Sequence, residues 1–182
     1  MMTQRTFPKA DNDQERIDVL HELKILDTSA EGVFDEITAL TASIFDIPTA
    51  IISLVDSQRQ WFKSRQCLAA QQTDRDVAFC NYTIMNTEVF EVDNPQTDTR
   101  FADNPLVTDE LGLRYYAGAP ITVRGFNIGA LCMLDYKKRE GLSEREKEML
   151  KTLARIVART INDHRLIRES AALVSELMMD VK

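Results

Sequence analysis

The sequence has few of the residue types from which disulfide frameworks, metal clusters and catalytic triads are built. Its three cysteines, Cys67, Cys80 and Cys132, lie far apart and form no CxxC pair, which argues against structural disulfides and a zinc site. Its two histidines, His21 and His164, are too few for a triad or a metal cluster. None of the six glycines belongs to a phosphate-cradling loop. We therefore expect a protein that is not an enzyme and holds no metal.

Long apolar runs and an excess of positive charge are also absent. No window approaches the roughly 18 uninterrupted apolar residues of a membrane span, and the polar N-terminus lacks the apolar stretch of a secretory signal. We therefore expect a cytoplasmic protein with reduced cysteines and no attachment to a membrane. The 29 acidic and 22 basic residues give a net charge of -7, which disfavours binding to nucleic acid. The length of 182 residues suits one domain.

Helical patterns lie at both ends of the chain, and β-rich runs lie between them. One helix is predicted over residues 12–26, with Asn12 and Glu15 spaced as a cap and its N3 partner, and a second begins at the capping box 28–31 and runs to Pro48. A third capping box, 143–146, opens a helical pattern that contains no glycine or proline as far as the C-terminus. The β-rich runs are 49–55 and 60–64, a short strand at 89–92, and a second hairpin of 114–123 and 128–136 with the turn 124–127.

This order of elements predicts an α+β fold. The strands make an antiparallel sheet of five to six strands, and the N- and C-terminal helices cover one of its faces. The less regular middle of the chain, with a short helix over 76–85, is left for the other face. Within it, residues 93–113 are polar and contain two prolines, and we interpret them as a lid whose order depends on a ligand.

Five runs of residues carry a resemblance to a known family. In this order along the chain they resemble the GAF domains of bacterial signalling proteins: SLVDSQRQWFKS (53–64), RDVAFC (75–80), DTRFADNP (98–105), YYAGAP (115–120) and GALCMLD (129–135). The resemblance implies a GAF domain over 12–165, with a disordered tail at 1–11 and a signalling helix extension at 166–182. It also implies a sheet with helices behind it and a pocket in front. Such domains accompany histidine kinases, diguanylate cyclases and phosphotransferase-system regulators.

The three chemistries known for the family find little support in the residues. Bilin attachment uses a Cys-His pair, but Cys80 is followed by Asn81. Free methionine sulfoxide reductases carry a cysteine in a glycine-rich segment, and Cys80 has no glycine beside it. The Asn-Lys dipeptide of cyclic-nucleotide-binding members is absent. The resemblance therefore implies a sensor of an unidentified small molecule, and the sequence names no cofactor.

The candidate ligand-binding residues are aromatic side chains with a few polar groups, a composition typical of small-molecule sites. Trp61 and Phe62 point to opposite faces of a strand, so at most one of them reaches the pocket. Arg100 has two interpretations, pairing with Asp98 or Asp103 and binding of an anion. Cys80 likewise fits either core packing or a ligand or redox role. The predicted set is Trp61, Phe79, Cys80, Arg100, Phe101, Tyr115 and Tyr116, with Phe62 as the alternative to Trp61.

The last helix is predicted to mediate dimerisation. A helix from Ser143 to Met178 would be roughly 54 Å long at 1.5 Å per residue, which exceeds the length of sheet that it can cover. Apolar residues along it alternate at three- and four-residue steps, as in a coiled coil. We expect a parallel homodimer, and the alternative is that the second half of the helix frays. The residues expected in the dimer helix contact are Leu153, Val157, Thr160, His164 and Ile167.

Three functions are consistent with these features. The first is a ligand sensor that relays a signal to a downstream signalling protein through helix contacts in a homodimer. The second is a GAF scaffold whose pocket is filled by its own side chains and which acts through protein contacts alone. The third is a thiol enzyme such as a free methionine sulfoxide reductase. We expect the first.

Overall fold

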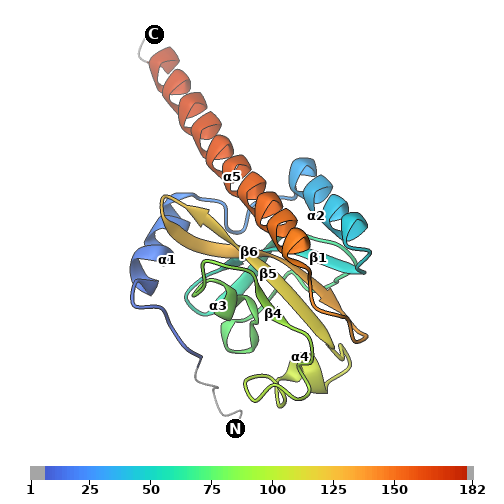
Figure 1. Ribbon diagram of the computed structural model, residues 1–182. Coiled ribbons are helices and arrows are strands. Elements are labelled where there is room, and N and C mark those ends of the chain that lie inside the picture. The colour runs from blue at the N-terminus through green and yellow to red at the C-terminus, as the bar shows by residue number, and fades with distance from the viewer. Residues whose placement is uncertain (1–6, 180–182) are drawn as a thin grey trace.

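An antiparallel sheet of six strands forms the centre of the computed structural model, which describes residues 7–179 (Figure 1). The strand order is β3-β2-β1-β6-β5-β4. This arrangement confirms the α+β prediction. The strands are β1 (Thr49–Val55), β2 (Arg59–Arg65), β3 (Gln72–Asp74), β4 (Phe90–Val92), β5 (Tyr115–Val123) and β6 (Phe126–Asp135).

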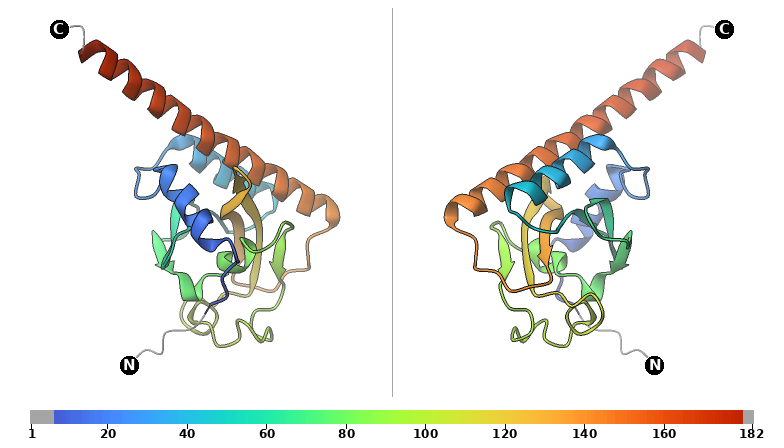
Figure 2. Two further views of the ribbon diagram at one scale, coloured as in Figure 1. Left: turned by 90° about the vertical axis from the view of Figure 1, so that its left-hand side faces the viewer. Right: turned by 90° about the vertical axis from the view of Figure 1, so that its right-hand side faces the viewer.

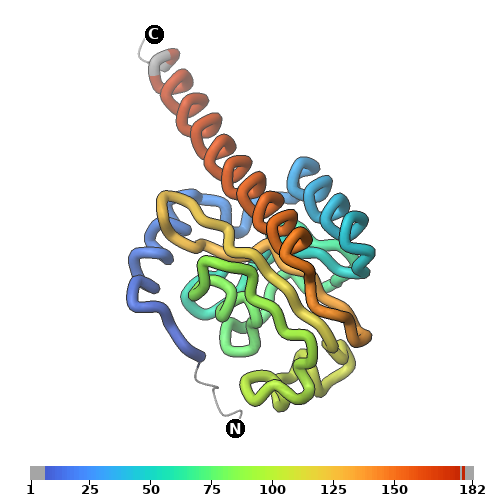
Figure 3. Tube along the Cα trace, in the orientation of Figure 1, coloured from blue at the N-terminus to red at the C-terminus, as the bar shows by residue number. Residues whose placement is uncertain are grey.

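The helices lie on both sides of this sheet. The long helices α2 (Gly32–Ile44) and α5 (Glu144–Met179) lie together on one face, and α1 (Asp13–Glu22) lies beside one end of the strands (Figure 2). The opposite face carries the short segments η1 (Arg75–Val77), α3 (Cys80–Thr83) and α4 (Pro105–Thr108). The C-terminal half of α5 projects well beyond the sheet (Figure 3).

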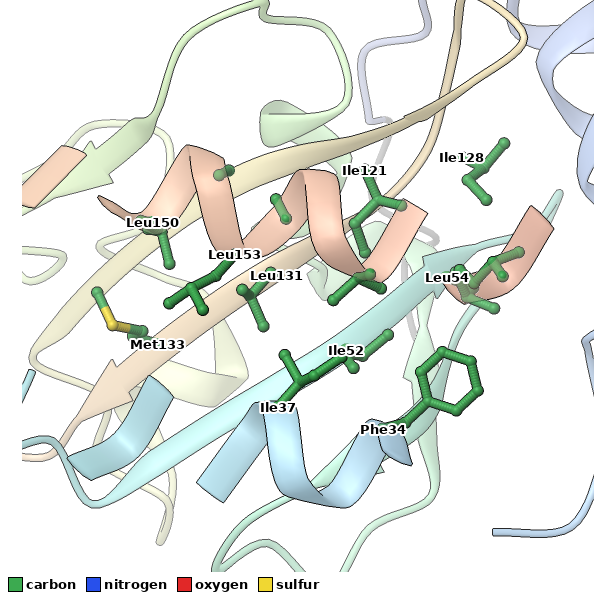
Figure 4. Close-up of a cluster of buried hydrophobic side chains, with 14 of the residues drawn as sticks. Phe34, Ile37, Ile52, Leu54, Ile121, Ile128, Leu131, Met133, Leu150 and Leu153 are labelled. Atoms are coloured by element: carbon green, nitrogen blue, oxygen red, sulfur yellow. The ribbon is translucent and has the colours of Figure 1, made fainter. Parts of the chain in front are cut away.

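The sheet separates two apolar cores. Between the sheet and the long helices, Phe34 and Ile37 of α2 and Leu153 of α5 pack on side chains of the central strands (Figure 4). The second core lies on the other face, beneath α3 and α4. All seven residues of β1 are buried because both of its faces are covered, which explains its almost continuous apolar sequence. The second core contains the candidate site.

Two of the three helix caps that the sequence predicts do not form. The capping box at 28–31 does not form, because the Thr28 hydroxyl donates to the Ile25 carbonyl and the Glu31 carboxylate accepts from Lys63. Asn12 precedes α1 but makes no side-chain capping bond. The capping box at Ser143 does form: the Glu146 carboxylate accepts from the Ser143 backbone N–H at 2.8 Å, and the Ser143 hydroxyl accepts from the Glu146 backbone N–H at 3.3 Å.

The irregular middle also differs in detail from the prediction. The single helix expected over 76–85 is divided into η1 and α3. Strand β3 was not predicted, because three polar residues at a sheet edge give no alternating pattern. The turn expected at 124–127 is tighter: Arg124 and Gly125 alone form it, with φ of 52° and 83°, the positive values of a type I′ hairpin turn.

The close approach of β1 and β6 depends on a residue without a side chain. A Cβ atom at Gly129 would lie 2.1 Å from the carbonyl oxygen of Ser53 on β1. Glycine therefore allows the two central strands to pair through this point. The β1–β6 pairing runs from Thr49 opposite Leu134 to Leu54 opposite Gly129.

The predicted tail at 1–11 and the predicted helix extension at 166–182 are only partly described by the structure. Residues 1–6 of the predicted tail and 180–182 of the predicted extension lie outside the described residues. Phe7, within the same predicted tail, lies against Arg75, whose guanidinium carbon is 4.9 Å from the ring centroid. Across residues 7–179, none of the helices combines the length and apolarity needed to cross a membrane.

Candidate functional site

A cavity of about 260 Å³ lies between the sheet and the short helices. Its floor is formed by β1, β2, β5 and β6, and its roof by residues around α3 and α4. The wall is mostly apolar, with Gln60, Thr73, Tyr116 and the two cysteines as its polar groups. The volume suits a compact molecule, since ligand pockets usually begin at about 300 Å³. The lining residues are Ile51, Gln60, Phe62, Leu68, Ala70, Thr73, Phe79, Cys80, Leu106, Leu111, Leu113, Tyr116, Cys132 and Leu134.

Strand alternation decides which of the predicted aromatic residues reach the cavity. Phe79 and Tyr116 line it, and on β2 it is Phe62 that does so. Trp61 and Tyr115 point to the other face and belong to the core beneath the long helices. The Tyr115 hydroxyl donates to Glu91 at 2.7 Å, and both burial and this carboxylate raise the pKa of the tyrosine. We therefore do not propose Trp61 or Tyr115 as ligand contacts.

Phe101 and Arg100 support the cavity from behind. The Phe101 ring stacks on Phe79 with 3.8 Å between centroids, but it is not in the cavity wall. The Arg100 guanidinium pairs with Asp98 at 2.5 Å and lies 5.0 Å from the centroid of the Phe90 ring. Of the two interpretations of Arg100, the structure therefore places it in a carboxylate pair over an aromatic surface, with its side chain 44% exposed.

The segment predicted to be a lid is partly anchored. Phe101 and Val107 are buried in the second core, and the buried Asn104 donates through its side-chain amide to the Val77 carbonyl at 3.0 Å. Leu111 lies in the cavity wall and is only partly buried. A lid movement therefore stays a prediction, and it is confined to the residues around Leu111.

Two thiols meet in the cavity wall. The Sγ atoms of Cys80 on α3 and Cys132 on β6 are 3.5 Å apart, and both residues are buried. The Tyr116 hydroxyl donates to Cys80 Sγ at 3.3 Å and lies 2.6 Å from the Thr83 hydroxyl. The sequence alone does not reveal this contact, because the two cysteines lie 52 positions apart along the chain.

The two thiols differ in acidity. Hydrogen bonding with Cys132, together with that from Tyr116 and Ser53, lowers the pKa of the Cys80 thiol against the opposing effect of burial. The hydrogen bond with Cys80 and burial raise the pKa of Cys132 well above its usual range. Cys80 is therefore the thiol that ionises first, and the thiolate is the nucleophilic form of cysteine.

A buried ionic network joins the cavity to α1. Asn81, which follows Cys80, accepts from Arg75 Nε at 2.8 Å and donates to the Pro8 carbonyl at 2.8 Å. The guanidinium of Arg75 in turn donates to the Asp13 carboxylate at 2.7 and 2.9 Å. Burial by itself raises the pKa of Asp13, but the hydrogen bonds and charges of Arg75 and Arg16 outweigh it and hold the pKa below its usual value.

The residues predicted for the dimer contact lie in several environments. Leu153 and Val157 are buried in the chain's own core against the sheet. The Thr160 hydroxyl donates to the Ile156 carbonyl, and His164 Nδ1 lies 2.6 Å from the Glu31 carboxylate of the same chain. Ile167 is 66% exposed. Because the first four already have partners within the chain, we propose only Ile167 of the predicted set as a dimer contact.

A different set of apolar residues is exposed on the outer half of α5. The exposed set is Leu166, Ile167, Leu173, Val174 and Met178. Two pairs in it repeat at seven-residue steps, Leu166 with Leu173 and Ile167 with Val174, as in a coiled coil.

The described residues also bear on metal binding. Among residues 7–179, no three acidic, cysteine or histidine side chains come together in a way that would hold a metal ion.

Comparison with known proteins gives a family match and a relative named as an enzyme. Residues 29–161 match the model of the GAF domain family. A protein of Pseudomonas aeruginosa named as a cyclic di-GMP phosphodiesterase is 39% identical over 178 residues. The match covers 96% of this chain but only 30% of that relative.

Solved structures share the fold at low sequence identity. The GAF domain of a phosphoenolpyruvate-protein phosphotransferase from Coxiella burnetii has a TM-score of 0.64 at 14% identity, over 87% of this chain and 99% of that one. The corresponding domain from Acinetobacter has a TM-score of 0.62 at 16% identity, over 85% and 98% of the two chains. Both matches extend over nearly the whole of the solved domains.

The expectation that the protein is not an enzyme is corrected by the Pseudomonas relative. That protein is similar to 96% of this chain and is named as a phosphodiesterase. The missing triads and metal clusters were observations on these 182 residues, and the relative is more than three times as long as the matched region.

Proposed function

Because the chain belongs to the GAF domain family, we propose that it is a sensor domain that binds a small apolar molecule and regulates the hydrolysis of cyclic di-GMP. The cavity between the sheet and α3 is the observation that carries the proposal. It supports ligand binding better than the filled-pocket scaffold, since an apolar space of about 260 Å³ is left open. We also propose a cytoplasmic location, because that compartment keeps thiols such as those of Cys80 and Cys132 free unless an oxidant reaches them.

The chemistry of the wall defines the class of ligand. Phe62, Phe79 and Leu134 offer apolar and aromatic contacts, whereas none of the cavity-lining residues in the described part of the chain is charged. A charged ligand would lose its hydration there without gaining a partner. The polar groups, including the Tyr116 hydroxyl, suit a neutral ligand with at most a few hydrogen-bonding atoms.

The regulatory part of the proposal rests on the relative named as a phosphodiesterase. A ligand in the cavity contacts Cys80 and Tyr116, and Asn81 next to Cys80 connects the cavity to α1 through Arg75. On the other side of the sheet, β5 and β6 contact α5. Ligand binding in the cavity can therefore affect both α1 and α5 through direct contacts within the domain.

We further propose a homodimer through the outer half of α5. Leu166, Ile167 and Val174 are exposed there and extend beyond the part of the helix that is buried on the sheet. A second copy of the same helix would cover them by the seven-residue repeat of a parallel coiled coil. Ligand-dependent changes in packing at the sheet would then be passed to whatever protein contacts this helix pair.

The cavity proposal is tested by blocking the cavity entrance. Ala70 is exposed and lies in the cavity wall, while its neighbour Ala69 is exposed and does not. Ala70→Trp should fill the space, and Ala69→Trp is the matched control. Benzene, a probe for dry apolar cavities, should shift the methyl NMR signals of Ile51 and Leu134 in the wild type and in Ala69→Trp. These shifts should be lost in Ala70→Trp, and identical responses of all three proteins would contradict the proposal.

The regulatory proposal is tested separately, on the natural gene product. Cyclic di-GMP hydrolysis should change at least about fivefold in Ala70→Trp, the lower end of usual coupling between sites, and stay unchanged in Ala69→Trp. A natural protein without this hydrolysis would refute the phosphodiesterase assignment and leave ligand binding in the cavity intact.

A further inference from the structure

Cys80 and Cys132 form an arrangement that ligand binding does not require. Their Sγ atoms lie 3.5 Å apart on two different elements, and both face the same cavity. A disulfide needs about 2.05 Å between sulfurs. A displacement of roughly 1.5 Å therefore separates the reduced pair from a bonded one. Cys80 is on the short helix α3, which has only four residues, so a shift of this one element towards β6 would close the distance.

We propose that this pair is a dithiol redox site that an organic hydroperoxide or hydrogen peroxide, admitted through the cavity, converts into a Cys80–Cys132 disulfide. The cavity brings the oxidant to both sulfurs, although the thiols are closed to bulk solvent. The site is independent of the proposed ligand, because it needs only that a small molecule can enter.

The reaction divides the two thiols into distinct roles. The Cys80 thiolate attacks one oxygen of the hydroperoxide, the O–O bond breaks, an S–O bond forms, and the alcohol or water leaves with the proton released by Cys80. The Cys132 sulfur then attacks Cys80 Sγ, the S–O bond breaks, and hydroxide leaves with the proton of Cys132 as water. The two cysteines together lose two electrons and two protons, and the peroxide is reduced.

The surroundings of Cys80 match the first role. The Tyr116 hydroxyl donates to its sulfur at 3.3 Å, and hydrogen bonding with Cys132 and Ser53 further favours its thiolate. Cys132 has the less acidic thiol and lies within the sheet, on β6, so it matches the resolving role. The exposed Cys67 takes no part in this arrangement.

Oxidation of the cysteine pair would also affect α1, outside the cavity. Bond formation draws α3 towards β6, and Asn81 of α3 is hydrogen-bonded to Arg75 and to the Pro8 carbonyl. Arg75 holds Asp13 of α1. The same contacts that connect the cavity to α1 therefore connect the redox state of the pair to α1.

The test uses the full chain, with tert-butyl hydroperoxide and hydrogen peroxide as probes. After treatment and alkylation of remaining thiols, mass spectrometry should show that Cys67→Ser loses two hydrogen atoms, and that both wild type and Cys67→Ser yield a linked peptide pair containing Cys80 and Cys132. Cys132→Ser should instead stop at a Cys80 sulfenic acid that dimedone traps, and Cys80→Ser should keep Cys132 reduced.

The wild type and Cys67→Ser test the proposed disulfide even if Cys80→Ser or Cys132→Ser does not fold. In the wild type the exposed Cys67 reports that the oxidant was effective. The proposal is overturned if both proteins keep Cys80 and Cys132 fully alkylatable under conditions that oxidise Cys67. It is also overturned if the only disulfides contain Cys67, or if Cys80 goes to the sulfonic acid without a disulfide.

Discussion

The carboxylate of Asp13 accepts two hydrogen bonds from the guanidinium of Arg75, 62 residues further along the chain, at 2.7 and 2.9 Å. Arg16 donates to the same carboxylate through Nε at 3.0 Å. Two buried arginines thus share one acid, which fixes α1 against the segment that leads into the cavity. The local stability of the cavity roof therefore depends on a residue of the first helix.

Replacing Asp13 by Asn should strongly destabilise the protein. The amide keeps the size of the side chain but leaves two buried guanidinium groups without their anion, a loss of about 3 to 5 kcal/mol for buried pairs. Urea unfolding followed by the fluorescence of Trp61, the single tryptophan, measures the effect. The exposed Asp11→Asn should stay within about 0.5 kcal/mol of wild type. Equal midpoints for the two variants would rule out this role of Asp13.

Stability should fall in acid. The pKa values of Asp13, Glu31 and Asp56 all lie below their usual values of 3.8, 4.5 and 3.8 in the folded protein. The unfolded chain therefore takes up protons first as the pH falls. The stabilisation is complete above about pH 5 and is lost as the pH drops through the folded-state pKa values. Urea midpoints at pH 7, 5, 4 and 3 should show this decline, and it should be shallower in Asp13→Asn than in Asp11→Asn.

A methyl group at Gly129 should disrupt the centre of the sheet. Its Cβ would lie 2.1 Å from the Ser53 carbonyl oxygen, so the backbones of β1 and β6 would have to separate. We expect Gly129→Ala to lower the free energy of unfolding by about 3 kcal/mol, the upper end for overpacking. Gly32→Ala is the control, because a Cβ there meets no atom within 4 Å and alanine favours the helix. Similar unfolding curves for the two variants would be incompatible with this explanation.

The dimer proposal predicts an effect confined to one side of α5. Ile167→Asp should shift the protein to monomer in sedimentation velocity at tens of micromolar, where modest interfaces are populated. Ala172→Asp places the same charge on the opposite side of the exposed helix, since five residues correspond to about 140° of rotation, and should leave the dimer intact. A wild-type protein that sediments as a monomer would end the proposal.

The remaining lid prediction concerns few residues. Because Phe101, Asn104 and Val107 are buried, amides near them should exchange slowly with or without a cavity probe. Amides of 109–112, around the cavity-lining Leu111, should exchange fast and be protected by benzene. No change at 109–112 in benzene-saturated protein would show that the lid does not respond to occupancy.

The strands and the long helices were predictable because their periodicity is strong. The runs 49–55, 114–123 and the helix from Ser143 each match a structural element to within a residue or two. Local rules failed where a distant partner competed: Glu31 completes no capping box because Lys63, on β2, takes its carboxylate. A capping pattern in the sequence cannot show such a partner.

The sequence predicts an apolar and aromatic pocket on one face of the sheet, but it identifies only some of the residues that line the cavity. Alternation shows that Trp61 and Phe62 lie on opposite faces, but both faces of β2 are covered by apolar cores, so composition does not identify the cavity side. The proximity of Cys80 and Cys132 depends on how α3 folds back over β6, and no local pattern encodes it. The association with a phosphodiesterase could not come from these residues either, because it was found through a relative that extends far beyond the matched region.

The 36-residue helix α5 also acts as a lever. Leu150, Leu153, Val157 and Ile161 fix one half of it on the sheet, and Arg168 still donates to the Leu23 and Lys24 carbonyls, so that residues 169–179 extend outward for about 16 Å. A tilt of about 8° at the sheet would therefore displace the distal end by about 2 Å, more than the change in sulfur separation that closes a disulfide in the cavity wall. A small movement at the sheet, which leaves the fold around the cavity unchanged, would thus displace the distal end of α5 far enough to change the packing of its side chains against a second helix.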